Sequence, residues 1–144
     1  MINSDSRSQT MKTMQILAMV LCLMVCFGSS AFAQDVKIQN VISAQIEAFK
    51  QDDVNTAFTF ASPKIQMMFR SPENFGKMVQ KGYPMVWRPA SVTFLGQKMD
   101  GGAVLQEMRF IDADGAGHLF VYEMVNISGI WKINGVYKIK ANYV

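Results

Sequence analysis

The spacing of the apolar residues changes once along this chain, near Tyr83-Pro84, and that change limits the folds available to it. Before this point, from residue 35 onward, apolar residues recur every three or four positions, which is the period of an amphipathic helix. After it, the period becomes two, which is typical of strands with one buried face. A run of helices followed by a run of strands predicts an α+β domain, with helices packed on a curved antiparallel sheet.

Several helices are expected in the first part of the domain. One covers residues 35–51 with Asp35 as its N-cap, and a second follows at residues 54–62. Ser62-Pro63 and Ser71-Pro72 then repeat one pattern, in which serine caps a helix and proline takes the first helical position, where no amide hydrogen is needed. Two short helices should therefore begin at these serines.

Glycine-containing turns divide the second part into strands. Asp100-Gly101-Gly102 and Ser128-Gly129 are typical hairpin turns, and Gly135 predicts a bulge or bend within the last strand. The sheet should have four strands, or five if residues 85–88 add a short strand at its edge. The four longer strands are expected at residues 91–99, 103–112, 118–127 and 130–139.

The register of the central hairpin decides which side chains share a face. One pairing sets Glu107 opposite Glu123, and another sets Glu107 opposite Tyr122. Like charges directly opposite each other are unfavourable, so the second register is preferred. It gives the helices an almost wholly apolar face, although a slip of one residue would exchange the two faces. The members of that face would be Val104, Met108, Phe110, Leu119, Val121 and Val125.

The amino terminus carries the pattern of a signal peptide. Arg7 and Lys12 precede an uninterrupted apolar run at residues 16–27, and Ala31-Phe32-Ala33 supplies small residues where a signal peptidase needs them. The run is shorter than the roughly 20 residues that span a bilayer. We therefore expect cleavage after Ala33, and a periplasmic or secreted protein with no membrane span after cleavage.

The expected division is a signal peptide at residues 1–33 and a single domain at residues 34–144. Met11 begins a typical signal-peptide opening of its own, so initiation at Met1 or at Met11 stays open. Both cysteines, Cys22 and Cys26, lie in the segment to be removed, which leaves the domain without a thiol. Lipidation is disfavoured because the bulky Val25 precedes Cys26.

Composition excludes several classes of function. With one histidine and no cysteine in the mature domain, we expect no metal site, because zinc sites need several such ligands. No sequence motif predicts a nucleotide or any other cofactor. The charged residues are spread without runs, so we expect no nucleic-acid partner.

The last strand reads Gly129-Ile130-Trp131-Lys132-Ile133-Asn134-Gly135-Val136. Together with the order of the elements, it resembles the nuclear-transport-factor-like superfamily, which includes SnoaL-like and ketosteroid-isomerase-like proteins. About residues 36–140 also resemble a family of small exported bacterial proteins known only as a domain of unknown function. The superfamily resemblance implies a cone-shaped fold with a pocket at its wide end. It implies no activity, because this fold hosts enzymes, binding modules and assembly adaptors.

The same resemblance suggests where a site would lie. Enzymes of the superfamily usually combine an acidic residue or histidine with a tyrosine, and this chain offers Glu107 or His118 with Tyr122. A solvated sheet face explains these residues more simply, so no catalytic residue is assigned. For ligand binding, the candidates are one cation and three aromatic side chains, although ordinary core packing is the simpler explanation for the aromatic ones. These four candidates are Arg109, Phe120, Trp87 and Tyr83.

Our first hypothesis is therefore a non-catalytic exported domain that binds a small apolar ligand or a protein partner. The alternatives are an isomerase- or cyclase-like enzyme, and a dimeric envelope adaptor whose open sheet face forms a homodimer.

Cleavage after Ala33 can be tested directly. Intact mass spectrometry of the protein, expressed from its full sequence in a bacterium, should give a mature chain that begins at Gln34. Ala33→Phe should accumulate as the precursor, because the peptidase accepts only a small residue at that position. Phe32→Leu, one position earlier, is the control and should be processed normally. Normal processing of Ala33→Phe would contradict the assignment.

Overall fold

The computed structural model describes residues 29–140 of the 144-residue chain. Most of the expected signal peptide lies outside this range. A compact unit of the chain begins at Val36. Within the described range, none of the helices combines the length and the apolar character needed to cross a membrane.

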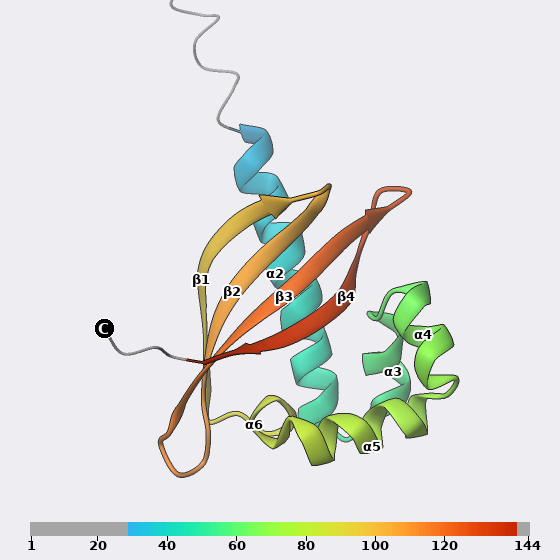
Figure 1. The fold of residues 1–144 in the computed structure, drawn as a ribbon, viewed down its shortest axis with the longest axis vertical. Helices are drawn as coiled ribbons and strands as arrows, with labels where there is room; N and C mark the ends of the chain where they lie inside the picture. Colours follow the sequence, from blue (N-terminus) through green and yellow to red (C-terminus); the bar gives the residue numbers. More distant parts are fainter. Residues whose placement is uncertain (1–28, 141–144) are drawn as a thin grey trace, which may run out of the picture. The chain divides into compact units, whose positions relative to one another are not determined.

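Helices occupy the first part of the described chain, as the periodicity predicts (Figure 1). The two expected serine caps are present, since the Ser62 and Ser71 hydroxyls accept from amides three residues later. Asp53 is a further cap, and its Oδ1 accepts from the Thr56 amide at 3.0 Å. These caps satisfy amide hydrogens that have no partner within a helix. The helices are α2 (Ser29–Lys50), α3 (Val54–Thr59), α4 (Pro63–Phe69), α5 (Pro72–Gly82) and α6 (Pro84–Trp87).

Two of these boundaries differ from the sequence prediction. Helix α2 begins at Ser29, so Asp35 lies inside it and is not an N-cap. The alanines and glutamine just before Asp35 favour a helix, which lets the helix extend upstream. Residues 85–88 are not an edge strand, because Pro84 starts the short helix α6, which buries Val86 and Trp87. Proline suits the first turn of a helix, and the sheet therefore has four strands rather than five.

The four strands form one antiparallel sheet in the order β1-β2-β3-β4. The register of β3 and β4 shifts between Glu123 and Met124, which leaves Asn134 as an extra residue beside Gly135. The bulge predicted at Gly135 is thus present, and a bulge bends and twists its strand. The strands are β1 (Ser91–Asp100), β2 (Ala103–Ile111), β3 (Gly117–Ile127) and β4 (Ile130–Ile139).

The register of the central hairpin differs from both predicted pairings. Glu107 lies opposite Val121, and Tyr122 lies opposite Gln106. The inner face of β2 is as predicted, but the inner face of β3 carries the alternate set of side chains. The reason is burial, because two aromatic rings remove more apolar area from water than the smaller aliphatic residues beside them. The inner face of β3 therefore presents Phe120, Tyr122 and Met124.

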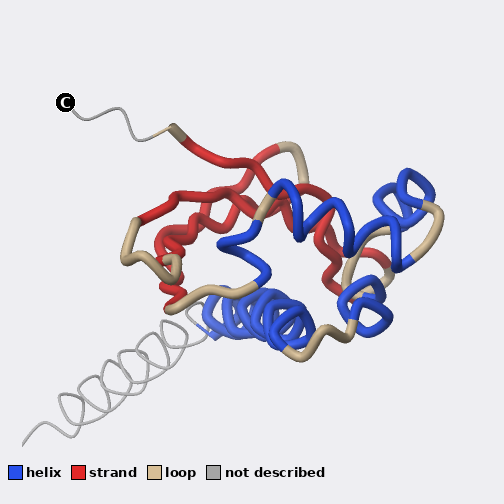
Figure 2. Tube along the Cα trace, turned by 90° about the horizontal axis from the view of Figure 1, so that it is seen from below, coloured by secondary structure: helices blue, strands red, loops and turns tan. Residues whose placement is uncertain are grey.

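The core lies between α2 and the inner face of the sheet. Figure 2 shows α2 along one face of the sheet, and Figure 1 shows α5 and α6 beside the carboxyl-terminal end of α2. From Ile38 onward, α2 buries one stripe of side chains with the spacing of an amphipathic helix. Phe49 at the end of this stripe packs on Trp87 of α6, with ring centroids 5.1 Å apart. The stripe consists of Ile38, Ile42, Ile46 and Phe49.

The chain between α3 and α4 adds to the free edge of β4. The Ile133 amide donates to the Phe60 carbonyl at 2.9 Å, and the Ser62 amide donates to the Ile133 carbonyl at 2.8 Å. Ala61 and Ile133 thus form a short parallel bridge. These bonds satisfy backbone groups of an edge strand and hold the start of α4 beside the bulge of β4.

Candidate functional site

An apolar cavity lies between α4, α5 and β4. It has a volume of about 280 Å³. An engineered apolar cavity of about 150 Å³ can hold benzene, so this space is sufficient for a molecule of one or two rings. Its inner wall is buried and mainly apolar. That wall includes Gln45, Phe49, Phe75, Val79, Val86 and Tyr122.

The mouth of the cavity is more polar and more exposed than its wall. Lys64 and Met68 of α4 line one side, and Asn134 and Tyr137 of β4 line the other. Met68 and Tyr137 are 60% and 51% exposed, whereas the side chains of the inner wall are buried. An apolar interior with a few polar groups is the usual composition of a small-molecule site.

The turn between α4 and α5 brings two apolar helix faces to this cavity. Arg70 ends α4 in the left-handed conformation, with φ of 65°, and its amide donates to the Gln66 carbonyl. The next helix begins immediately at Pro72. The chain changes direction over these few residues, and Phe69 packs edge-on against Phe75 with centroids 5.6 Å apart. The Ser-Pro pattern seen in the sequence therefore builds one wall of the cavity.

A chain of hydrogen bonds holds the bulged strand at the mouth. The Ser62 hydroxyl donates to Asn134 Oδ1 at 2.8 Å, and Asn134 Nδ2 donates to Glu123 Oε1 at 2.6 Å. The Tyr137 hydroxyl donates to Glu123 Oε2 at 2.7 Å. Together the bonds from Asn134 and Tyr137, with the charge of Lys64, lower the pKa of Glu123. Hydrogen bonding to this carboxylate in turn raises the pKa of Tyr137.

Gly135 makes room for this arrangement. A Cβ atom at Gly135 would lie 2.5 Å from the Tyr137 hydroxyl oxygen, so any side chain there would displace the ring. Glycine in a strand often marks such a close approach. The sequence pattern located the bulge, and the structure adds that Gly135 allows Tyr137 to reach Glu123.

Two polar side chains belong to the inner wall. Gln45 is buried, and its Nε2 donates to the Ala57 carbonyl at 3.1 Å. Tyr122 is fully buried, and its hydroxyl has no hydrogen-bond partner within the described part of the chain. Burial, with a smaller contribution from Tyr83, raises the pKa of Tyr122, so the hydroxyl stays protonated at neutral pH.

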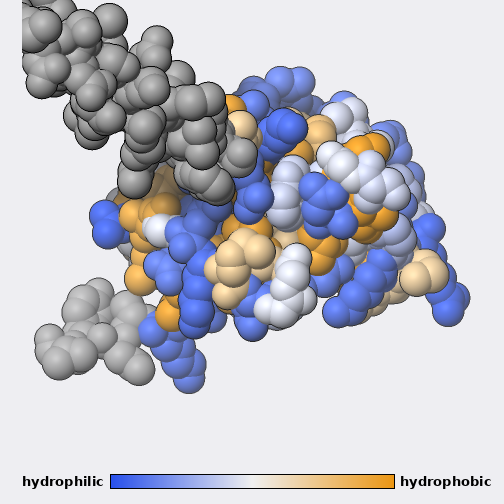
Figure 3. All heavy atoms as spheres, turned by 90° about the horizontal axis from the view of Figure 1, so that it is seen from above, coloured by the Kyte–Doolittle hydropathy of each residue, from blue (hydrophilic) through white to orange (hydrophobic). Residues whose placement is uncertain are grey.

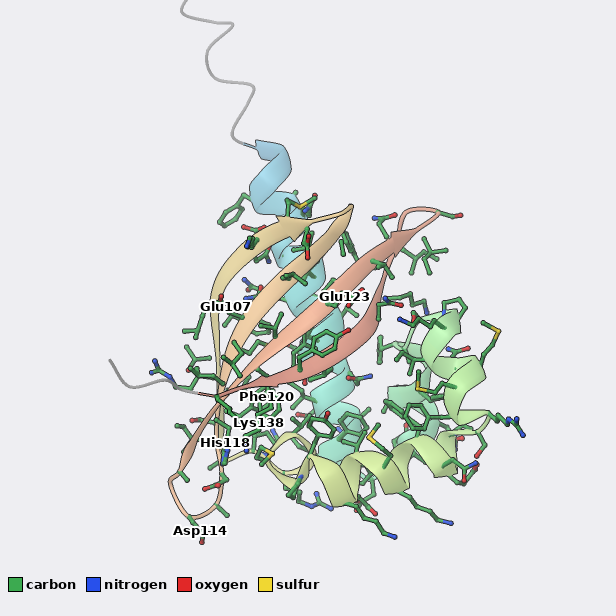
Figure 4. The ribbon with its side chains drawn as sticks, viewed as in Figure 1. Glu107, Asp114, His118, Phe120, Glu123 and Lys138 are labelled. Atoms are coloured by element: carbon green, nitrogen blue, oxygen red, sulfur yellow. The ribbon has the colours of Figure 1, made fainter. Side chains whose placement is uncertain are left out.

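The structure does not bring together the residues expected for catalysis. Glu107 lies exposed on the outer face of the sheet, and Tyr122 points to the inner face from the neighbouring strand. Figure 4 shows His118 near the β2–β3 turn, away from Glu123. The His118 side chain is 16% exposed, and its Nε2 lies 2.7 Å from Asp112 Oδ2. This contact lowers the pKa of Asp112 and fixes the histidine to the turn.

The four residues expected for ligand binding also separate. Tyr83 lines the cavity. Phe120 lies behind it, with ring centroids 5.9 Å apart, and Trp87 packs in the core against Phe49. Arg109 is exposed on the outer face, beside Thr93 of β1.

Sequence reasoning missed most of the polar residues of the cavity. It singled out neither Gln45, Lys64, Asn134 nor Tyr137 as a site residue. One available signal was the Asn134-Gly135 pair, because a residue beside a bulge often carries a re-aimed side chain. Gln45 offered a second signal, as a polar residue within the apolar stripe of α2. Neither signal indicates a cavity unless the packing of α4 against β4 is known.

The hydrogen bonds to Glu123 predict a pH dependence of stability. Its pKa in the folded protein is lower than the ordinary value of 4.5, so its contribution is present above that pH and is lost as the pH falls through the folded value. Glu123→Gln should be less stable than the wild type at about pH 7, with a smaller difference at about pH 3. Denaturant unfolding at both pH values measures this.

Asp114→Asn is the control, because it removes an exposed carboxylate in the β2–β3 turn and leaves the bonds to Glu123 in place. It should lose stability in acid as the wild type does. A constant difference between Glu123→Gln and the wild type at both pH values would contradict the role of Glu123.

Comparisons with known proteins agree with this fold. A crystal structure of an NTF-2 like protein of unknown function from Shewanella oneidensis MR-1 is similar, with a TM-score of 0.51 and 16% sequence identity. The match covers 73% of this chain and 98% of that one. At this identity the likeness shows the fold alone, which confirms the predicted nuclear-transport-factor-like α+β cone.

No curated protein matches the chain. The family model described as Domain of unknown function (DUF4864) matches residues 31–143, which is most of the sequence. The resemblance seen in the sequence is therefore confirmed, and the chain belongs to the DUF4864 family.

Proposed function

We propose that this domain binds a small, mainly apolar ligand in the cavity between α4, α5 and β4, and that it does so without catalysis. The observation that carries the proposal is the cavity of about 280 Å³, which has a buried apolar wall and a polar mouth. Burial of a ligand against such a wall is favourable by about 25 cal/mol for each Å² of apolar area removed from water.

The positions of the charged residues support binding over proton transfer. General acid–base catalysis needs a titratable group within hydrogen-bond reach of the substrate. The two carboxylate oxygens of Glu123 accept hydrogen bonds from Asn134 and Tyr137, His118 contacts Asp112 near the opposite turn, and Glu107 faces outward. The inner wall is instead built from aliphatic, aromatic and amide side chains.

We also propose that the ligand is bound outside the cytoplasm, after removal of residues 1–33. The support is the sequence of that segment, with its basic residues, apolar run and Ala31-Phe32-Ala33. A domain without cysteine suits such a compartment, because its stability depends on its core rather than on thiol chemistry.

Filling the cavity should abolish binding. Val136 lines the cavity from β4 and is half-buried, so Val136→Trp should occupy part of the space. An apolar fluorescent dye that binds the wild-type protein should lose at least about tenfold in affinity, because the substitution removes buried contact area from the ligand. Fluorescence titration gives the affinity.

Met67→Trp is the matched control. Met67 is 74% exposed and lies on α4 next to the lining residue Met68, so the added ring should remain in solvent. It should leave dye affinity within about twofold of the wild type, since no cavity contact changes. Equal affinity in both variants would mean that the dye binds elsewhere, and would count against the cavity as the site.

A second proposal concerns the outer face of the sheet, which we expect to form a homodimer. This face combines half-buried and exposed apolar side chains with several charged ones, among them Glu107 and Arg109, which lie two positions apart on β2. In a two-fold dimer each patch meets a copy of itself, so Glu107 of one protomer can face Arg109 of the other. The apolar members of this face include Leu105, Leu119, Val121, Val125 and Ile139.

The dimer can be tested by measuring mass in solution. Light scattering should give about twice the mass of one mature chain for the wild type, and one chain for Val121→Lys, because a charge would be buried in the interface. Met67→Lys, which changes an exposed apolar residue far from this face in sequence, should stay dimeric. A monomeric wild-type protein would overturn the proposal.

A further inference from the structure

We propose that the ligand is uncharged and carries a hydrogen-bond acceptor, such as a carbonyl oxygen, which the hydroxyl of Tyr122 binds at the inner wall of the cavity. This inference rests on the proposed binding function and adds the chemical class of the ligand. Two observations point to it: Tyr122 lines the cavity, and its hydroxyl has no partner among the described residues.

An unpaired buried hydroxyl is unusual in a folded protein. Most buried polar side-chain atoms have at least one hydrogen-bond partner, and leaving one without a partner is destabilising. Phe110 stacks on the Tyr122 ring at 6.2 Å between centroids. The buried amide of Gln106, which lies opposite Tyr122, is bonded to Gln97 and to the Glu107 carbonyl rather than to the Tyr122 hydroxyl. A ligand that supplies an acceptor would therefore form a bond that the protein alone leaves unmade.

Tyr122 acts as the donor in this interaction. Its burial raises its pKa, so the hydroxyl keeps its proton over the physiological range. Tyr83, which also lines the cavity, is half-buried and packs on Phe120. Only Tyr122 combines complete burial with an unpaired hydroxyl among the lining residues that the structure describes.

The charges near the cavity favour a neutral ligand. The inner wall carries amide, hydroxyl and apolar groups, and transfer of an ion to such surroundings is costly. At the mouth, the positive charge of Lys64 acts on the carboxylate of Glu123, which lowers the pKa of Glu123. The two opposite charges leave the mouth with little net attraction for either kind of ion.

A pair of two-ring compounds tests the inference. 1-Tetralone has a carbonyl oxygen, and tetralin has the same ring skeleton without it. Both are of a size that a cavity of about 280 Å³ can accept. Isothermal titration calorimetry of the mature protein should show tetralone binding roughly tenfold more tightly than tetralin, because only tetralone pairs the buried hydroxyl.

Tyr122→Phe removes one oxygen atom and keeps the ring. It should reduce the preference for tetralone to less than about twofold while leaving tetralin affinity unchanged, since the apolar contacts remain. Tyr83→Phe is the matched control, because it removes the hydroxyl of another lining tyrosine. This control should keep the preference for tetralone.

The outcomes separate this inference from the proposal on which it rests. Binding of both compounds without a preference, or a preference that survives Tyr122→Phe, would overturn the role of Tyr122 and leave the binding function standing. A preference lost in Tyr83→Phe instead would overturn the assignment of the donor. If neither compound binds, the proposed apolar ligand site falls together with this inference.

Discussion

Helix α2 packs its apolar stripe onto the inner face of the sheet, and the positions of the other elements follow from this contact. Ile38 and Ile42 are fully buried, as are Phe110, Phe120 and Tyr122 on the strands opposite them. A slip of one residue in β3 would move its two aromatic side chains to the outer face. The requirement to bury these rings therefore selects the register of the whole sheet, including which residues remain available on its outer face.

The cavity forms where this packing meets the edge of the sheet. Backbone bonds between residues 60–62 and Ile133 hold the start of α4 beside β4, and the bulge at Asn134 redirects the strand at the same point. Ser62 and Glu123 then fix the bulged residue through its amide. At the mouth, Asn134, Tyr137 and Glu123 are hydrogen-bonded to one another, whereas the inner wall keeps one hydroxyl without a partner among the described residues. This difference supports the proposal that the cavity binds a ligand.

The candidate site was much less predictable than the fold. Of the four residues expected to bind a ligand, Tyr83 lines the cavity, whereas Trp87 and Phe120 belong to the core, and Arg109 to the outer face. Tyr122 was expected beside Glu107 and instead faces the helices. Each of these differences follows from a one-residue shift of β3 relative to the predicted register, or from the packing among the helices. Neither the register of β3 nor the packing among the helices can be predicted from the spacing of apolar residues along the chain. Alternating apolar and polar residues show that a strand has two faces, but they do not show which face is buried.

The sequence by itself determined the order of the elements, most of their boundaries and the family to which the chain belongs. These features depend on local interactions: serine and aspartate caps, proline at the first helical turn, glycine turns, and the periods of helix and strand. Only the tertiary structure decided the register of the sheet, the helical state of residues 84–87, and the meeting of Gln45, Lys64 and Tyr122 around one cavity. The physical reason is that these three features depend on how much apolar surface is buried between segments far apart in the chain. The same local elements could pack in many arrangements, and the arrangement that buries the most apolar surface is favoured.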